Sequence, residues 1–124
     1  MDRINFESEQ GIHELGVTYV HDLLDRVGFT IQEVNKDPEH HYQLLVRIKN
    51  RAMLIAIRTA HSPEVGTLDK PMKEKLIEEA KRLNAVPHFA GISLTSKNES
   101  DIQNKGLAQV VEDNIIFNGM TVVR

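Results

Sequence analysis

The sequence predicts an α/β domain in which a mixed central sheet is flanked by helices. Three observations support this prediction: an amphipathic helix near the N-terminus, three strand-like segments joined by short turns, and a second helix before a fourth strand. Strands joined by short turns run antiparallel, whereas a strand reached through a helix usually runs parallel to its neighbour. The expected sheet is therefore mixed.

Composition limits the classes of protein to which the chain can belong. With 124 residues we expect a single domain over 1–124, and 40% hydrophobic with 27% charged residues is ordinary for a globular chain. The absence of cysteine excludes disulfides, thiolate metal sites and a cysteine nucleophile. A net charge of −3 argues against a surface that is basic throughout. No membrane-length apolar run or signal-peptide pattern is present, so we expect a cytoplasmic protein.

The first helix is expected to end at Gly28, which would form a left-handed C-terminal cap. We expect His13 and His21 to flank its apolar stripe at the surface. The stripe has helical spacing over about four turns and consists of Ile12, Leu15, Gly16, Tyr19, Val20, Leu23, Leu24 and Val27.

Alternation and turn residues predict three strands after this helix. The first covers Phe29–Val34 and precedes a turn around Asp37-Pro38. The second and third cover Tyr42–Ile48 and Ala52–Thr59, and the short connection between them predicts an antiparallel hairpin. The two-residue period of a strand then places Ala56 and Arg58 on one face of the third strand.

The second half of the chain is expected to begin with a loop over 61–68 and a helix capped by Asp69, which ends near Asn84. Pro87 forbids a longer helix. The remaining elements expected are a strand over Ala90–Thr95, a short helix over Ile102–Val111, and a terminal hairpin in which Asn118-Gly119 joins Ile115–Phe117 to Met120–Val123. The predicted order is helix, strand, strand, strand, helix, strand, helix, hairpin.

Three local stretches carry a family resemblance. They are Gly28–Ile31 after an amphipathic helix, Ala80–Pro87 before an apolar strand, and Ile115–Gly119 near the end. With the order of elements, they resemble the restriction-endonuclease-like superfamily, the PD-(D/E)XK nucleases. The pattern is most similar to type IV, methylation-dependent restriction nucleases and archaeal Holliday-junction resolvases.

The resemblance implies where a nuclease site would lie. In that superfamily an Asp on the second strand, and a Glu or Gln two residues before a Lys on the third, serve a Mg²⁺-dependent reaction. These positions fall on Gln43, Ala56 and Arg58. Gln43 offers only a neutral amide oxygen, Ala56 offers no ligand, and Arg58 does not deprotonate. The resemblance therefore implies a degenerate nuclease site, with no confident catalytic residue and no metal.

Two alternatives stay open at this point. Catalytic carboxylates of a Mg²⁺-dependent nuclease could have moved to other positions of the same half of the chain, for which the candidates are Glu14, Glu33, Asp37, Glu39 and His61. Surface charge and turn formation are the simpler interpretations of these residues. His40-His41 could instead bind a metal, but adjacent residues of a strand usually point to opposite sides, which favours an ordinary polar loop.

A basic cluster surrounds the predicted turn of the second and third strands. It comprises Arg47, Lys49 and Arg51, and Arg58 follows on the third strand. In a nuclease-like fold such residues would contact the phosphate backbone. An equally good interpretation is a charged hairpin that keeps the protein soluble and prevents edge pairing. The function expected is binding of DNA, of a second copy or of a protein partner, with a purely structural or regulatory interaction module as the remaining alternative and no role at a membrane.

Overall fold

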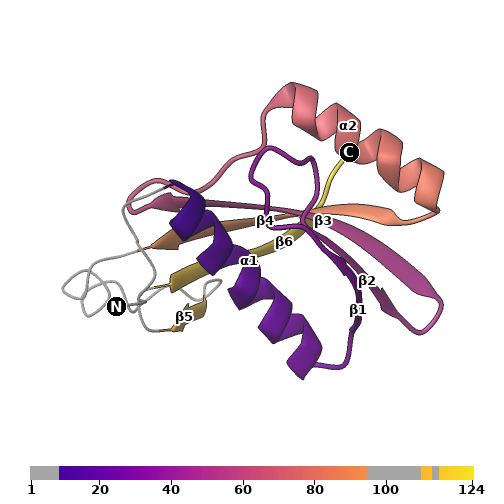
Figure 1. The fold of residues 1–124 in the computed structure, drawn as a ribbon, viewed down its shortest axis with the longest axis horizontal. Coiled ribbons are helices and arrows are strands. Elements are labelled where there is room, and N and C mark those ends of the chain that lie inside the picture. The colour runs from indigo at the N-terminus through magenta and orange to yellow at the C-terminus, as the bar shows by residue number, and fades with distance from the viewer. Residues whose placement is uncertain (1–8, 95–109, 113–114) are drawn as a thin grey trace.

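The computed structural model describes residues 9–94, 110–112 and 115–124. They form a mixed α/β fold with one sheet and a helix on each side of it (Figure 1). The elements are α1 (Glu9–Arg26), β1 (Thr30–Val34), β2 (Leu44–Ile48), β3 (Arg51–His61), α2 (Lys70–Leu83), β4 (Val86–Leu94), β5 (Val110–Glu112) and β6 (Ile115–Val122).

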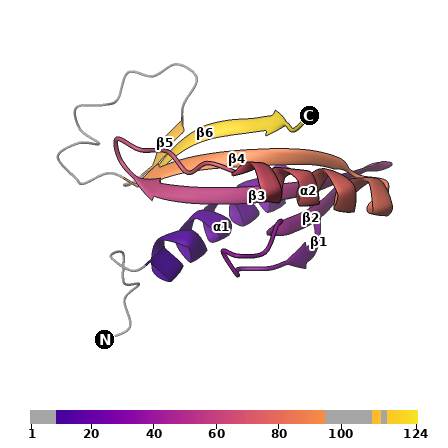
Figure 2. The same ribbon diagram turned by 90° about the horizontal axis from the view of Figure 1, so that it is seen from above.

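The sheet contains six strands in the order β1-β2-β3-β4-β6-β5, which Figure 2 shows side by side. Strand β3 pairs with β4 in parallel, while every other neighbouring pair is antiparallel. Helix α2 forms the crossover between the two parallel strands. The expected mixed sheet is therefore confirmed, as is the order of the first six elements.

Two hydrophobic clusters hold the helices on opposite faces of the sheet. On the α1 face, Val17 and Val20 pack with Ile55 and Ile57. On the α2 face, Leu54 and Ala56 pack with Leu76 and Ala80, so alternate residues of β3 serve the two sides. Burial of these apolar side chains removes them from water, which is the main force that holds the layers together.

The ends of both helices follow the signals in the sequence. Gly28 after α1 has a φ of 107°, a conformation that glycine adopts without steric cost. At the start of α2, the Asp69 carboxylate accepts a hydrogen bond from the Met72 N–H at 2.9 Å. At its end, Asn84 is left-handed, and its N–H donates to backbone carbonyls of the last turn.

The predicted terminal hairpin is wrong. Residues 115–122 form the single strand β6, and Asn118-Gly119 lies within it. Opposite these two residues the neighbouring strand has one, Gly91, because Ala90 pairs with Met120 and Ile92 with Phe117. Gly119 has a φ of 87°, so its conformational freedom serves a β-bulge and not a turn.

The other differences concern boundaries and one helix. The fourth strand begins at Val86, before the expected start at Ala90, because its pairing with β3 begins there. The helix predicted over Ile102–Val111 is wrong for Val110 and Val111, which lie in β5, and its other residues lie outside the described part of the chain. Among the described helices, none is long and apolar enough to cross a membrane.

Candidate functional site

The positions that correspond to the nuclease motif meet where β2 begins beside β3. Strand β2 begins at Leu44, which pairs with Ile55, while β3 continues to His61. The backbone of β3 beyond Ile55 therefore has no β2 residue beside it. Without other partners, the N–H and C=O of the buried Ile57 would be left unpaired, which costs free energy.

Side chains supply the missing partners at this edge. The Ile57 N–H donates to Oε1 of Gln43 at 2.7 Å. The Ile57 carbonyl accepts from Nη1 of Arg58 at 2.9 Å. Gln43 and Arg58 thus continue the hydrogen bonding along β3 where β2 has not yet begun.

The amide of Gln43 uses its whole hydrogen-bonding capacity inside the protein. Its Nε2 donates to the carbonyl oxygens of Asp37 at 3.2 Å and His40 at 2.9 Å. Its Oε1 accepts from Ile57 and also from Nη1 of Arg58, at 2.9 Å. Two donors and two acceptor positions are what a primary amide has, so the fully buried Gln43 side chain has no lone pair left for another ligand.

The guanidinium of Arg58 lies among the oxygens at this edge of the sheet. Its Nη1 lies 2.9 Å from both Gln43 Oε1 and Ile57 O, and its Nη2 donates to the His40 carbonyl at 3.2 Å. Burial lowers the pKa of Arg58, with Asp69 acting in the opposite direction, but an arginine remains charged at neutral pH. The cation among these oxygens is thus a guanidinium of the chain itself.

The motif position occupied by Ala56 has no room for a ligand. Ala56 is fully buried and packs under α2 against Leu76 and Ala80. Mg²⁺ prefers near-octahedral oxygen coordination and is usually bound through one or two carboxylates and several waters. Gln43, Ala56 and Arg58 together offer no carboxylate and no free oxygen, so the residues present do not fit the Mg²⁺ site that the resemblance implies.

The candidate residues of a relocated catalytic site do not come together as a metal-binding group in the described part of the chain. Oδ1 of Asp37 accepts from the Glu39 N–H at 2.9 Å, which is an Asx turn, as the Asp37-Pro38 sequence indicates. Glu14 accepts from Gln10 on its own helix at 2.6 Å, and His61 is exposed at the end of β3. Within the described residues, no group of three or more histidines and acidic residues is arranged to hold a metal ion.

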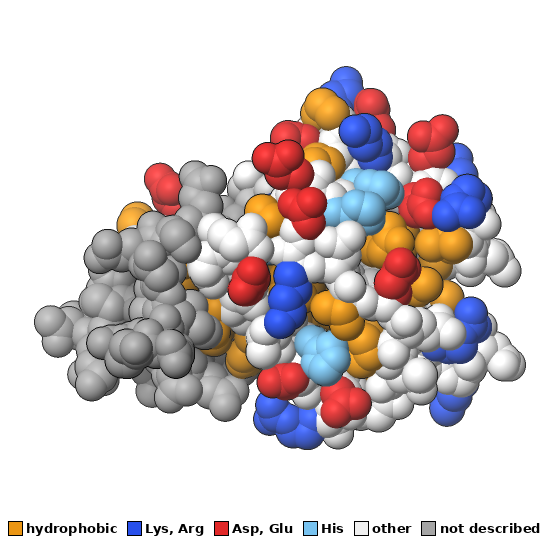
Figure 3. All heavy atoms as spheres, viewed as in Figure 1, with side chains coloured by type: hydrophobic (Ala, Val, Ile, Leu, Met, Phe, Trp, Pro, Cys, Tyr) orange, Lys and Arg blue, Asp and Glu red, His pale blue; other side chains and the backbone are white. Residues whose placement is uncertain are grey.

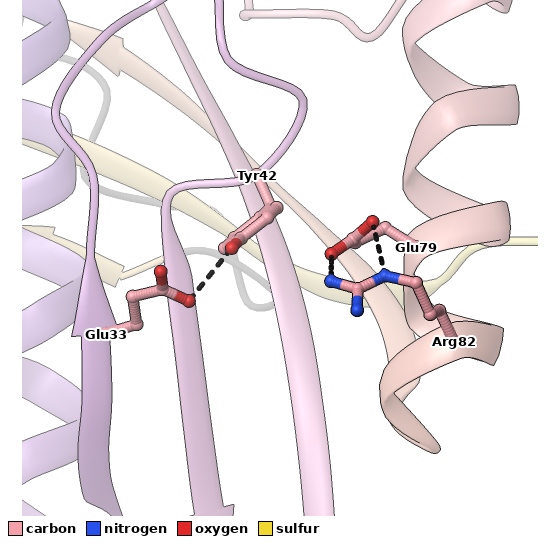
Figure 4. A network of polar contacts seen from close by, with 4 residues as sticks. All are labelled: Glu33, Tyr42, Glu79 and Arg82. Carbon is pink, nitrogen blue, oxygen red and sulfur yellow. Dashed lines mark hydrogen bonds and ion pairs between the residues drawn. The ribbon is translucent and has the colours of Figure 1, made fainter.

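Glu33 is bound to a buried tyrosine, as Figure 4 shows. The Tyr42 hydroxyl donates to Oε1 of Glu33 at 2.8 Å. Burial and this carboxylate raise the pKa of Tyr42 to about 12, because ionisation would place a second negative charge beside Glu33. The neighbouring pair joins the exposed Arg82 to the half-buried Glu79 of the same helix α2 and is separate from the tyrosine pair (Figure 4).

His40 and His41 lie in the loop between β1 and β2, with ring centroids 4.5 Å apart. Each ring also contacts Tyr42, at 4.6 and 5.2 Å. The expected polar loop before the second strand is confirmed, but the two rings lie against each other and not on opposite sides of the chain. Burial and the adjacent His40 lower the pKa of His41, which favours a neutral ring packed against its neighbours.

His13 was expected at the surface, and this expectation is wrong. Only 4% of the residue is exposed, and its Nε2 is buried without a hydrogen-bond partner among the described residues. Burial, with a smaller contribution from Arg58, lowers the pKa of His13 to about 4, so the ring is neutral at pH 7. The sequence does contain a signal for this position, since His13, Val17, Val20 and Leu24 have 4-3-4 spacing and share the buried face of α1.

The basic residues divide into two groups. Arg47, Lys49 and Arg51 are exposed at the β2–β3 hairpin, in the region at the lower right of Figure 3 where blue side chains gather. Arg58 lies seven residues along β3 from Arg51, which at about 3.3 Å per residue is roughly 23 Å. The structure therefore brings three of the four residues together and places Arg58 in the buried site.

The described residues form a mixed α/β domain in which Gln43 and Arg58 supply hydrogen-bond partners to the edge of β3. The chain belongs to the family described as Domain of unknown function (DUF8840), whose model matches residues 10–123. No curated protein matches the chain. Among solved structures, the chain is similar to Hjc of Archaeoglobus fulgidus, a Holliday junction resolvase from an archaeal hyperthermophile. The two are 14% identical, with a TM-score of 0.47, over 78% of this chain and 84% of the archaeal one.

Proposed function

We propose that this domain is a catalytically silent, nuclease-like module of the cytoplasm that binds nucleic acid without cleaving it. One observation supports the proposed loss of catalysis. Nη1 of Arg58 donates to both Gln43 Oε1 and Ile57 O, the two oxygens that could otherwise contact a metal ion. A divalent cation there would have to displace a buried guanidinium and break a closed set of hydrogen bonds.

The proposed binding surface is the basic hairpin, defined as Arg47, Lys49 and Arg51. All three side chains are exposed, and no acidic residue occurs between His40 and Pro63 in the sequence. The chain as a whole carries a charge of −3, so a general positive field cannot supply the attraction. A few local contacts to phosphates would have to supply most of the affinity, with little dependence on base sequence.

The test compares the wild type with two charge variants over a salt series. Changing Arg47, Lys49 and Arg51 together to Ser should weaken binding to a short DNA duplex and flatten the salt dependence by about one unit of slope for each lost contact. Changing Lys70, Lys73 and Lys75 together to Gln alters net charge equally on α2 and should leave both quantities nearly unchanged.

Each result has a distinct meaning. Equal affinity and equal slope for the hairpin variant and the wild type would refute nucleic-acid binding by the hairpin and favour a protein partner or a second copy. Binding accompanied by cleavage in Mg²⁺ or Mn²⁺ would refute the loss of catalysis and favour relocated carboxylates.

A further inference from the structure

The basic hairpin carries its cations on both faces of a two-stranded ribbon. In the β2–β3 register, Arg47 pairs with Ala52 and Ile48 pairs with Arg51. Cross-strand partners share a face, and alternate residues change face. Arg47 therefore points to the side of the sheet that α2 covers, whereas Arg51 points to the side that α1 covers.

The end of this hairpin extends past both neighbouring strands. Strand β1 begins at Thr30, opposite Arg47, and β4 begins at Val86, opposite Met53. Among the described strands, none therefore lies beside the last pair, Ile48 with Arg51, or beside the turn Lys49-Asn50. Figure 1 shows the β2–β3 connection projecting at the lower right of the sheet.

The turn contains a residue whose backbone conformation is unfavourable for it. Lys49 has a φ of 54°, a left-handed conformation that glycine or asparagine would adopt at lower cost. Such outliers are often retained where the side chain serves a function. Lys49 lies at the tip of the projecting ribbon, and in the sequence it stands between Arg47 and Arg51.

We infer that the hairpin tip enters the major groove of a B-form DNA duplex. Arg47 and Arg51 contact phosphates of opposite strands, and Lys49 reaches into the groove between them. The major groove is about 12 Å wide and admits a two-stranded β-ribbon. The inference rests on the proposed function and adds to it the kind of nucleic acid and the role of each face.

Other nucleic acids fit this arrangement less well. A single strand offers one row of phosphates, so it can satisfy the cations of only one face at a time. The major groove of A-form RNA is deep and too narrow for protein side chains to enter. The geometry of the hairpin therefore favours duplex DNA over both.

The test measures binding of the wild type to four probes by fluorescence anisotropy at one salt concentration. They are a DNA duplex, its single strand, the RNA duplex of equal length, and a DNA duplex whose major groove is filled by bulky uncharged groups at C5 of the pyrimidines. The plain DNA duplex should bind about tenfold or more tightly than each of the other three, since only it offers an open, wide groove between two strands. Equal binding of the plain and filled duplexes would overturn groove entry.

Lys49→Gly separates a functional role of the lysine from a structural one. Because glycine relieves the left-handed backbone, the melting temperature should stay the same or rise. Affinity for the DNA duplex should fall, whereas Lys81→Gln, an exposed control on α2, should leave it unchanged. If Lys49→Gly binds as tightly as the wild type, the lysine does not enter the groove.

The two proposals can fail separately. If single-stranded and duplex DNA bind equally and both depend on the basic hairpin, groove entry fails while nucleic-acid binding stands. If no probe binds in a manner that depends on the hairpin, the proposed function itself fails.

Discussion

Replacement of Gln43 by Met should destabilise the fold through the edge of β3. Methionine is close to glutamine in volume and leaves no large cavity, but it can replace none of the four hydrogen bonds. Ile57 is fully buried, so its N–H would lose its partner where water cannot replace it, at a cost of about 1–3 kcal/mol. The carbonyls of Asp37 and His40 lie nearer the surface, and loss of their bonds adds about 0.5–1.5 kcal/mol each. We expect a total loss of about 3 kcal/mol.

Urea denaturation followed by circular dichroism measures this quantity, provided that unfolding is two-state. Gln32→Met on the exposed outer strand β1 is the matched control and should change stability by no more than about 0.5 kcal/mol. A loss below about 1 kcal/mol for Gln43→Met would show that the amide does not complete the sheet edge.

Three further substitutions test neighbouring parts of the structure. The pKa of His13 is about 4 in the folded state and 6.5 in the unfolded state, so the unfolded state binds more protons between these values. The free energy of unfolding therefore falls as pH is lowered through that window. His13→Gln should make this free energy, measured in urea from pH 7 to pH 4, clearly less dependent on pH, and an unchanged profile would contradict burial of a neutral ring. Ala56→Glu places a carboxylate beneath α2 and should lower the melting temperature by about 10 °C, which corresponds to about 3 kcal/mol. Calorimetry should detect no Mn²⁺ site in this variant. A stable variant with a stoichiometric Mn²⁺ site would show that position 56 can accept a metal ligand. Gly66→Ala would bring a Cβ to 2.1 Å from the Arg58 backbone and should destabilise the loop before α2, which a melt comparable to the wild type would refute.

Local sequence patterns were sufficient for most of the fold. Helical spacing located α1, the capping residue Asp69 located the start of α2, and a short turn located the β2–β3 hairpin. The hairpin predicted at Asn118-Gly119 is wrong because a hairpin turn and a β-bulge both use a glycine with positive φ. Which of the two forms depends on Gly91 of the neighbouring strand, which is distant in sequence.

The site was predictable in its residue types but not in its geometry. Gln43, Ala56 and Arg58 are recognisable from the sequence as poor metal ligands. That Arg58 lies inside the site and apart from Arg47 could not be inferred, since its guanidinium is held by carbonyls of Ile57 and His40 in two different segments. His13 was misplaced because histidine is often partly exposed, although its helical spacing matches the buried face.

We propose that the domain binds duplex DNA through its basic hairpin but does not cleave it. The most direct measurement incubates the purified protein and an end-labelled duplex with Mn²⁺, then analyses one half on a native gel and the other on a denaturing gel. We expect a shifted band on the native gel that the hairpin variant fails to form, and full-length strands on the denaturing gel. Shortened strands that are formed by the wild type and are lost with the hairpin variant would contradict this proposal, because cleavage would then be an activity of this domain.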